Sequence, residues 1–189
     1  MQNETIAIHA GYNKKEGNGS MAVPITQTTA YAFRDSEHAA NLFALKELGP
    51  IYTRLTNPTT DVLEQRFAAL EGGAAAICVA SGQSAIFYAV ANVAEAGDNI
   101  LISDKLYGGA VTLLSHTMKR FGITTKVFRS EDASNLEEQI DGKTKAIFFE
   151  SLSNPQIAIT DVEKVVEIAK RHGVLTICDN TVASAALFN

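Results

Sequence analysis

The stretch AAAICVASGQSAIFYAVANVAEA, residues 74–96, has a strand–turn–helix pattern around which the rest of the chain is predicted to be arranged. It opens with an apolar run, residues 74–79, whose length suits a buried strand. A turn of small residues (SGQS, 81–84) follows, and then an apolar helix over residues 83–94. The first N–H groups of a helix have no partner within it, and the positive end of the helix dipole lies beside them. The turn is therefore either an ordinary strand-to-helix connection or an anion site suited to phosphate.

Strands and helices continue to alternate along the rest of the chain. Four further apolar runs predict strands, at residues 99–103, 125–128, 145–150 and 174–179. Further helices are expected over residues 109–121, 135–140 and 161–172, the last with Thr160 and Glu163 at capping-box spacing. This alternation indicates βαβ units and a parallel sheet with helices on both faces. The sequence thus predicts an α/β fold with a parallel-rich sheet.

The region before this pattern, residues 1–56, lacks strong periodicity apart from a short predicted helix over residues 37–48. We expect an extended N-terminal arm without a core of its own, which contacts a partner subunit. The large domain is expected to cover residues 57–189. It begins with Asn57 as a helix N-cap and Pro58 in the first helical position.

Composition narrows the class of protein. The 189 residues are 46% hydrophobic and 20% charged, with a net charge of −5, as in a globular protein with a substantial core. Without a cluster of basic residues, neither nucleic acid nor a membrane surface is an expected partner. The absence of an apolar leader at the start favours a cytoplasmic location. Cys78 and Cys178 lie in apolar runs and are expected in the core, and no metal site is expected because the histidines lack ligand spacing.

Polar side chains follow most of the predicted strands. They are Asp104 and Tyr107 after the second, Glu150, Ser153 and Asn154 after the fourth, and Asp179, Asn180 and Thr181 after the fifth. Ligands of parallel sheets bind beyond the carboxyl ends of the strands. A carboxylate in the apolar context of Asp179 requires a cationic partner or hydrogen bonds. Neither a Gly-x-Gly-x-x-Gly nor a Walker motif is present, so a dinucleotide site and a nucleoside triphosphatase are not expected.

Five pieces of the chain carry a resemblance to a known family: YTRLTNPT (52–59), ASGQSA (80–85), LYGG (106–109), ESLSNP (150–155) and CDNT (178–181). In this order and spacing they resemble the N-terminal half of the Cys/Met-metabolism family of pyridoxal-phosphate enzymes. The resemblance implies a large domain of the aspartate-aminotransferase type, incomplete in this chain. FALKELGPIYTR (43–54) and Gln83 are similar to the O-acetylhomoserine sulfhydrylase branch, because related lyases carry Met in place of Gln83.

The resemblance implies pyridoxal 5'-phosphate as the cofactor and assigns residues to its parts. Ser81, Gly82 and Gln83 would bind the phosphate, the last two through backbone N–H groups. Tyr107 would stack on the pyridine ring. Asp179 would pair with the ring nitrogen and keep it protonated, so that the ring accepts electrons from a carbanion. Tyr107 and Asp179 are thus the expected catalytic residues.

Five further residues receive roles from the resemblance. Asn154 would bind the 3-hydroxyl region of the cofactor or the substrate carboxylate, with Glu150 beside it at the substrate. Thr181 would be an orienting hydroxyl near the cofactor. Tyr52 and Arg54 would reach across a homodimer or homotetramer interface to the neighbour's phosphate, for which a guanidinium is well shaped.

The reaction that the resemblance implies for the full-length enzyme is γ-replacement. O-acetylhomoserine and sulfide, or a thiol, would give homocysteine, or methionine, and acetate. Cystathionine γ-synthase and methionine γ-lyase are alternatives in the same family. The family's Schiff-base lysine would lie beyond Asn189, so the chain is expected to be an N-terminal fragment that is inactive alone. A noncatalytic cofactor-binding or assembly module is the alternative from another class.

Overall fold

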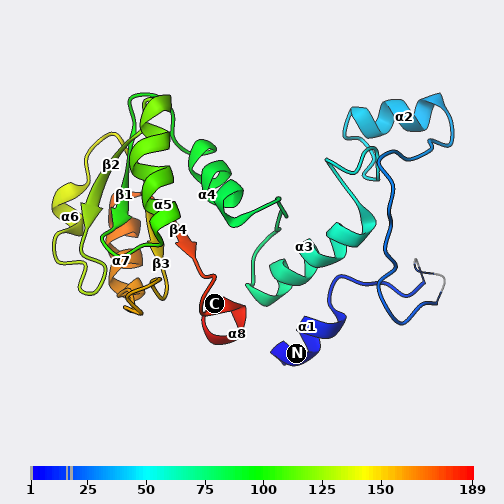
Figure 1. Ribbon diagram of the computed structural model, residues 1–189. Helices are drawn as coiled ribbons and strands as arrows, with labels where there is room; N and C mark the ends of the chain where they lie inside the picture. Colours follow the sequence, from blue (N-terminus) through cyan, green and yellow to red (C-terminus); the bar gives the residue numbers. More distant parts are fainter. Residues whose placement is uncertain (1, 16, 18) are drawn as a thin grey trace. The chain divides into compact units, whose positions relative to one another are not determined.

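The computed structural model describes residues 2–15, 17 and 19–189. The chain forms two compact units, one reaching to Cys78 and including Asn189, the other spanning Val79–Phe188. We call them the N-terminal unit and the sheet unit, and Figure 1 shows their elements. The expected arm over residues 1–56 and its contact with a partner subunit stay predictions.

The sheet unit contains four parallel strands. They are β1 (Asn99–Ser103), β2 (Thr124–Phe128), β3 (Thr144–Glu150) and β4 (Leu175–Asp179), in the order β2-β1-β3-β4. All four lie where the apolar runs predict strands, within one residue at each end. β2 pairs with one edge of β1, and β3 pairs with the other edge of β1. The strand order therefore reverses between β1 and β3, and the carboxyl ends of these two strands flank that point. The register pairs Glu150 with Asp179, so that two carboxylates end neighbouring strands.

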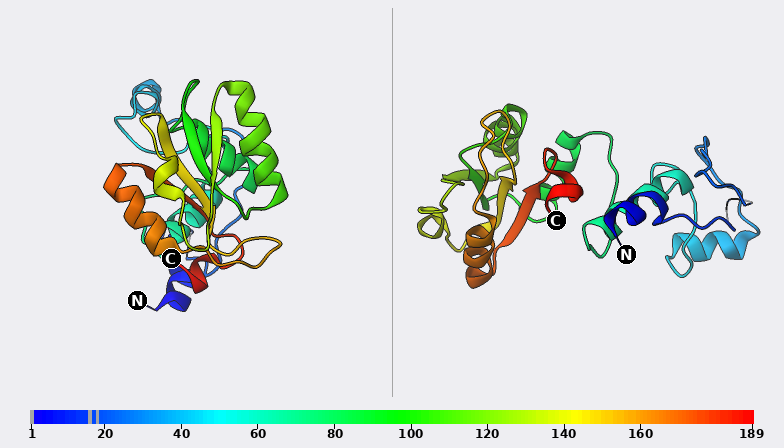
Figure 2. Two further views of the ribbon diagram at one scale, coloured as in Figure 1. Left: turned by 90° about the vertical axis from the view of Figure 1, so that its left-hand side faces the viewer. Right: turned by 90° about the horizontal axis from the view of Figure 1, so that it is seen from below.

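Helices cover both faces of this sheet, as predicted (Figure 2). On one face lie α4 (Gly82–Ala91) and a continuous helix that begins as α5 (Gly108–Thr112) and goes on as a π-helical turn, Leu113–Thr117, and a 3-10 turn, Met118–Phe121. On the other lie α6 (Leu136–Gln139) and α7 (Val162–His172). The unit ends with α8 (Ser184–Leu187).

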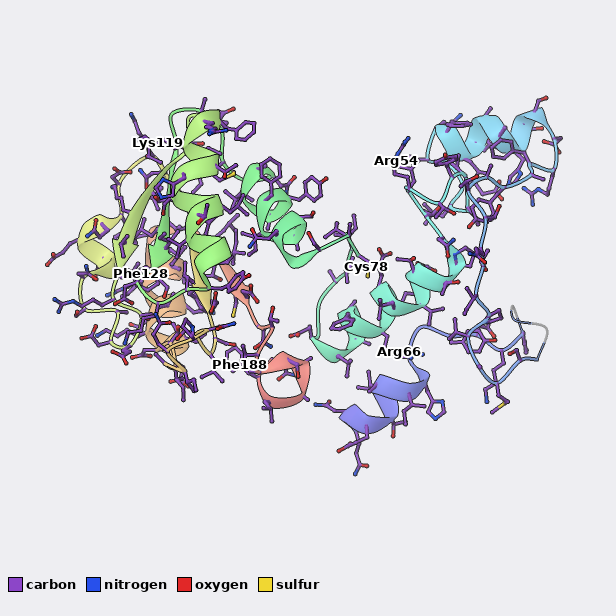
Figure 3. All side chains as sticks on the ribbon, viewed as in Figure 1. Arg54, Arg66, Cys78, Lys119, Phe128 and Phe188 are labelled. Atoms are coloured by element: carbon purple, nitrogen blue, oxygen red, sulfur yellow. The ribbon has the colours of Figure 1, made fainter. Side chains whose placement is uncertain are left out.

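Each face of the sheet has its own hydrophobic core because side chains alternate along the strands. Ile100 and Ile102 of β1 pack with α4 and α5, whereas Leu101 packs with α6 and α7. Phe128, labelled in Figure 3, is completely buried in the second core. Burying a side chain of this size stabilises the fold by about 1.5–3 kcal/mol. The two cores fix the strands, and with them the positions of the loops at their carboxyl ends.

The start of α7 differs from the predicted capping box. Asp161 is the N-cap, and its side chain accepts a hydrogen bond from the Lys164 N–H at 3.1 Å. Thr160 is buried, and its hydroxyl donates to the Glu150 carbonyl oxygen at 2.6 Å. The hydroxyl supplies a hydrogen bond to the last carbonyl of β3, because a buried backbone carbonyl without a partner would raise the free energy of the folded state.

The predicted strand over residues 74–79 is wrong. This segment forms neither helix nor strand and pairs with no strand of the described chain, and Ile77 is 82% exposed. Its apolar composition predicted burial, yet a strand also needs a hydrogen-bonding neighbour. The prediction that Cys78 and Cys178 are core residues is wrong as well, since both are exposed, the second on the edge strand β4.

The described residues of the N-terminal unit form three helices, α1 (Asn3–His9), α2 (Ser36–Phe43) and α3 (Pro58–Leu70). As predicted, Asn57 caps α3 by accepting a hydrogen bond from the Thr59 N–H, and Pro58 is the first helical residue. α1 packs against α3, and Arg66 of α3 donates through Nε to the Ala10 carbonyl oxygen at 3.0 Å (Figure 3). Among the described residues of this unit, Leu42 is the one apolar side chain that is buried.

Candidate functional site

The first component of the site is the amino end of α4. Ser81 is the N-cap, and its Oγ accepts a hydrogen bond from the Ser84 N–H at 3.1 Å. The N–H groups of Gly82 and Gln83 begin the helix and, as first-turn groups, have no acceptor within it. A Cβ added at Gly82 would meet no atom within 4 Å, so the helix end is open on this side. The turn therefore presents donors and a positive dipole end to a cavity.

The second component lies beyond β1 and β3. Glu150, the last residue of β3, is buried, and its two carboxylate oxygens each accept one backbone hydrogen bond. Oε1 accepts from the Tyr107 N–H at 2.7 Å, and Oε2 from the Asn154 N–H at 3.0 Å. The Tyr107 side chain is half exposed. The backbones of Tyr107 and Asn154 are thus bound to one carboxylate.

The third component lies beyond β4. Asp179 ends the strand, and one of its oxygens, Oδ1, accepts hydrogen bonds from both the N–H and the hydroxyl of Thr181. The neighbouring Asn180 accepts from the Ser151 hydroxyl at 2.7 Å and donates to the Phe188 carbonyl oxygen at 2.6 Å. The Ser151–Asn180 bond joins the loops after β3 and β4, and the two Thr181 bonds hold the Asp179 carboxylate in one orientation.

One cavity of about 320 Å³ within the sheet unit brings these components together. Eight of the predicted site residues line it: Ser81, Gly82, Gln83, Tyr107, Glu150, Asn154, Asp179 and Thr181. Ile86, Leu152 and Val182 also line it, and none of these three is among the predicted site residues. A signal for them exists, because each lies within four residues of a predicted site residue. Their apolar side chains give the cavity walls suited to an uncharged ring face.

Gly109 allows two side chains that line this cavity to pack closely against the backbone. A Cβ added at Gly109 would lie 2.5 Å from Gln83 Nε2 and 2.5 Å from Cε1 of the Tyr107 ring. The side chains of Gln83 and Tyr107 therefore both pack directly over the Gly109 backbone. The second glycine of LYGG is needed for this close approach, and not only for the start of α5.

The remaining two predicted residues, Tyr52 and Arg54, belong to the N-terminal unit. The Arg54 guanidinium lies over the Tyr52 ring, 5.4 Å from its centroid, and both side chains are exposed. Figure 3 shows Arg54 on the loop between α2 and α3, its side chain directed away from the ribbon of that unit. The pair is accessible to an anion, and its contact with a neighbouring site stays a prediction.

The described part of the chain contains no group of three or more His, Cys, Asp and Glu side chains placed to bind a metal ion. None of its helices is both long and apolar enough to cross a membrane.

Comparison with known proteins identifies the family. The model of the family described as "Cys/Met metabolism PLP-dependent enzyme" matches residues 4–189. The chain belongs to this family. The resemblance inferred from the five sequence pieces is thereby confirmed, and so is the pyridoxal-phosphate dependence of the family to which they point.

Curated relatives within the Cys/Met metabolism family share much of the sequence. The chain is 48% identical to an O-acetyl-L-homoserine sulfhydrylase of Leptospira meyeri, over 98% of this chain and 42% of that protein. It is also 48% identical to a homocysteine synthase of Schizosaccharomyces pombe, over 94% of this chain and 42% of the relative. The chain thus spans about two fifths of the length of these curated relatives.

A solved structure from Campylobacter jejuni, titled as an O-acetylhomoserine (thiol)-lyase with a pyridoxyl-lysine-5'-monophosphate, is also similar. It matches with a TM-score of 0.95 and 55% identity, over 98% of this chain and 46% of that one. The predicted α/β fold of an incomplete large domain is therefore confirmed.

Proposed function

We propose that the cavity of the sheet unit binds pyridoxal 5'-phosphate. The observation that carries this proposal is the convergence on one cavity of a helix N-terminus, an aromatic ring and an oriented carboxylate. These three groups suit the three parts of the cofactor, which are a phosphate, a flat ring and a basic ring nitrogen. The family match and the solved relative with its pyridoxyl-lysine support the same ligand.

Different residues of the cavity bind the phosphate, the ring and the ring nitrogen of the cofactor. The N–H groups of Gly82 and Gln83, with Ser81, hold the phosphate at the positive end of α4. The Tyr107 ring stacks on the cofactor ring. Asp179 holds a proton on the ring nitrogen, and Thr181 keeps the Asp179 carboxylate directed at it. When bound, pyridoxal 5'-phosphate supplies an electron-accepting ring that stabilises negative charge on substrate carbons.

The proposed reaction of the complete enzyme is γ-replacement: O-acetylhomoserine and sulfide, or a thiol, give homocysteine, or methionine, and acetate. Names of relatives such as O-acetyl-L-homoserine sulfhydrylase and homocysteine synthase support this substrate pair. Asn154 is proposed to bind the cofactor's 3-hydroxyl region or the substrate carboxylate. Tyr52 and Arg54 are proposed to reach the neighbour's phosphate in a homodimer or homotetramer, and the enzyme is proposed to be cytoplasmic.

Two measurements test the proposal. Titration of the chain with 4'-deoxypyridoxine 5'-phosphate, an analogue without the aldehyde, reports binding in the cavity without imines on surface lysines. No saturable binding would overturn the cofactor site. For the reaction, the enzyme extended to the length of its relatives should form homocysteine from O-acetylhomoserine and sulfide. Activity confined to O-succinylhomoserine with cysteine would indicate cystathionine γ-synthase, and methanethiol release from methionine would indicate methionine γ-lyase.

One observation favours a second function, a noncatalytic cofactor-binding module. Among the described residues that line the cavity, none is a lysine. Chemistry that begins with a cofactor-linked lysine is therefore not carried by these side chains. The gene sequence beyond codon 189 distinguishes the two functions, because the enzyme requires a lysine in a Ser-x-x-Lys context there and the module does not.

A further inference from the structure

Glu150 makes two contacts that the proposed cofactor site does not explain. It ends β3 and is only 4% exposed, although it carries a carboxylate. Its Oε1 accepts the Tyr107 N–H at 2.7 Å and its Oε2 accepts the Asn154 N–H at 3.0 Å. A single side chain therefore joins the loop that follows β1 to the loop that follows β3.

The chemistry of burial makes these two bonds important. A buried carboxylate is costly unless hydrogen bonds or a cation compensate for the lost water. None of the ion pairs among the described residues involves Glu150. The backbone N–H groups of Tyr107 and Asn154 are therefore its strongest compensation. Such charge-assisted bonds are roughly twice as strong as neutral ones, so both loops are held firmly.

Each loop is arranged so that its N–H is available for this bond. Tyr107 precedes α5 as its N-cap residue, and the N–H of an N-cap residue has no acceptor inside the helix. Asn154 lies in a loop that is closed on itself by a Leu152–Ile159 bridge and by the Ser153 N–H to Ala158 carbonyl bond of 2.9 Å. The Glu150 bond therefore fixes the backbone of this closed loop at Asn154, from which the amide side chain extends.

We infer that Glu150 is a positioning residue whose carboxylate fixes the Tyr107 ring and the Asn154 amide relative to each other across the cavity. This inference rests on the proposed cofactor site. It gives Glu150 a different role from the substrate binding that the family resemblance implied. A carboxylate at the substrate would repel the substrate carboxylate, whereas a carboxylate bound to two N–H groups needs no substrate to be stable.

We call the two hydrogen bonds that the Glu150 carboxylate accepts, from the Tyr107 and Asn154 N–H groups, the clamp. Two substitutions distinguish the loss of this clamp from a general loss of stability. Glu150→Gln keeps the shape but replaces one acceptor oxygen with an NH₂ donor, which cannot accept either N–H. Glu150→Asp keeps both acceptors on a side chain one methylene shorter. Thr144→Val is the matched control: it removes a buried hydroxyl that donates to Asn99 Oδ1 at 2.9 Å, at the opposite end of the same strand.

The first measurement is amide hydrogen exchange by NMR on the 189-residue chain without ligand. In Glu150→Gln we expect exchange of at least one of the Tyr107 and Asn154 amides to rise at least about 10-fold, because only one acceptor oxygen remains for the two N–H groups and it carries no charge. Glu150→Asp keeps the charge and both acceptor oxygens but places them one methylene further from the two N–H groups, so it should restore part of the protection. In Thr144→Val these two amides should exchange at the wild-type rate, once the exchange rates are corrected for any change in the melting temperature of the variant. Unchanged exchange of both amides in Glu150→Gln would overturn the clamp.

The second measurement is the affinity for 4'-deoxypyridoxine 5'-phosphate. We expect Glu150→Gln to bind about 10-fold more weakly, Glu150→Asp to recover part of the loss, and Thr144→Val to match wild type. Equal affinity of Glu150→Gln and wild type, alongside faster amide exchange, would overturn the positioning role and favour substrate binding by Glu150. Failure of wild type to bind the analogue would overturn the proposed cofactor site and the positioning role with it. The amide-exchange measurement would still show whether the two hydrogen bonds of the clamp exist.

Discussion

Thr181 donates two hydrogen bonds, one from its backbone N–H and one from its hydroxyl, to the same oxygen of the Asp179 carboxylate. Asp179 ends an edge strand, where few neighbours restrict its side chain. The two bonds supply that restriction. They hold Asp179 Oδ1, so that the second oxygen of the carboxylate remains the natural acceptor for a protonated ring nitrogen.

Thr181→Val should weaken the binding of 4'-deoxypyridoxine 5'-phosphate by about 10-fold. Valine has the shape of threonine but no hydroxyl, so Asp179 keeps one of its two bonds and loses its fixed orientation. Isothermal titration calorimetry on the chain measures the effect. Thr181→Ser is the control because it retains the hydroxyl, and equal losses in both variants would contradict an orienting role.

Asp179→Ala should weaken the same analogue by at least about 30-fold and abolish turnover in the enzyme extended to the length of its relatives. Removing one partner of a hydrogen-bonded charge pair leaves the other without compensation. Titration of the chain and the homocysteine assay check the two expectations. Near-normal turnover in this variant would exclude a ring-nitrogen role for Asp179.

The sequence predicts the fold of the sheet unit well because its signals are local. The centres of β1 (Ile100–Ile102) and β3 (Ala146–Phe149) are uninterrupted apolar runs, and both runs are buried on the two faces of the sheet. The cap at Asn57 depends on the residue itself and on its next neighbours. These features depend on residues that are adjacent in the sequence, so they can be predicted without knowing which distant residues are in contact.

The failed predictions concern segments whose state depends on a partner. The run at residues 74–79 has the composition of a buried strand, but no strand of the described chain pairs with it. Cys178 lies in an apolar run as well, yet an edge strand exposes part of its length. Apolar composition measures the tendency to leave water, and it contains no information on which neighbour is present.

The candidate site is predicted as a set of residues but not as a set of contacts. Parallel topology places Tyr107, Asn154 and Asp179 at the same edge of the sheet, which follows from the order of strands and loops. The bridging of two loops by Glu150 and the close approach over Gly109 depend on distances between segments far apart in the chain. These contacts are specified only by the folded backbone.

Gly109→Ala should destabilise the chain by about 1–3 kcal/mol and weaken binding of the cofactor analogue, because the new methyl would overlap the Gln83 amide and the Tyr107 ring. Urea unfolding and analogue titration measure the two effects. Gly108→Ala is the matched control, since a Cβ there meets no atom within 4 Å and alanine favours a helix by up to about 1 kcal/mol. Equal stability of the two variants would contradict the close approach.

Acid should destabilise the sheet unit through Asp141, at the opposite end of the sheet from the cavity. Hydrogen bonds from the Lys126 ammonium and from the Asn99 amide hold the pKa of the Asp141 carboxyl well below its ordinary value of about 3.9. A lowered pKa in the folded state means that the unfolded state binds the proton more tightly. The stabilisation is therefore complete above the ordinary carboxyl range and is lost as the pH falls below about 4 toward the pKa of the folded state.

Urea unfolding between pH 6 and pH 3 measures this dependence. We expect the unfolding midpoint of wild type to fall across that range and the midpoint of Asp141→Asn to change less, because the amide cannot titrate. Glu167→Gln, on the exposed face of α7, controls for the loss of one negative charge and should keep the wild-type slope. If Asp141→Asn shows the full wild-type slope instead, the acid sensitivity arises from other carboxyls, such as Glu137, whose pKa is lowered by its hydrogen bond with His172.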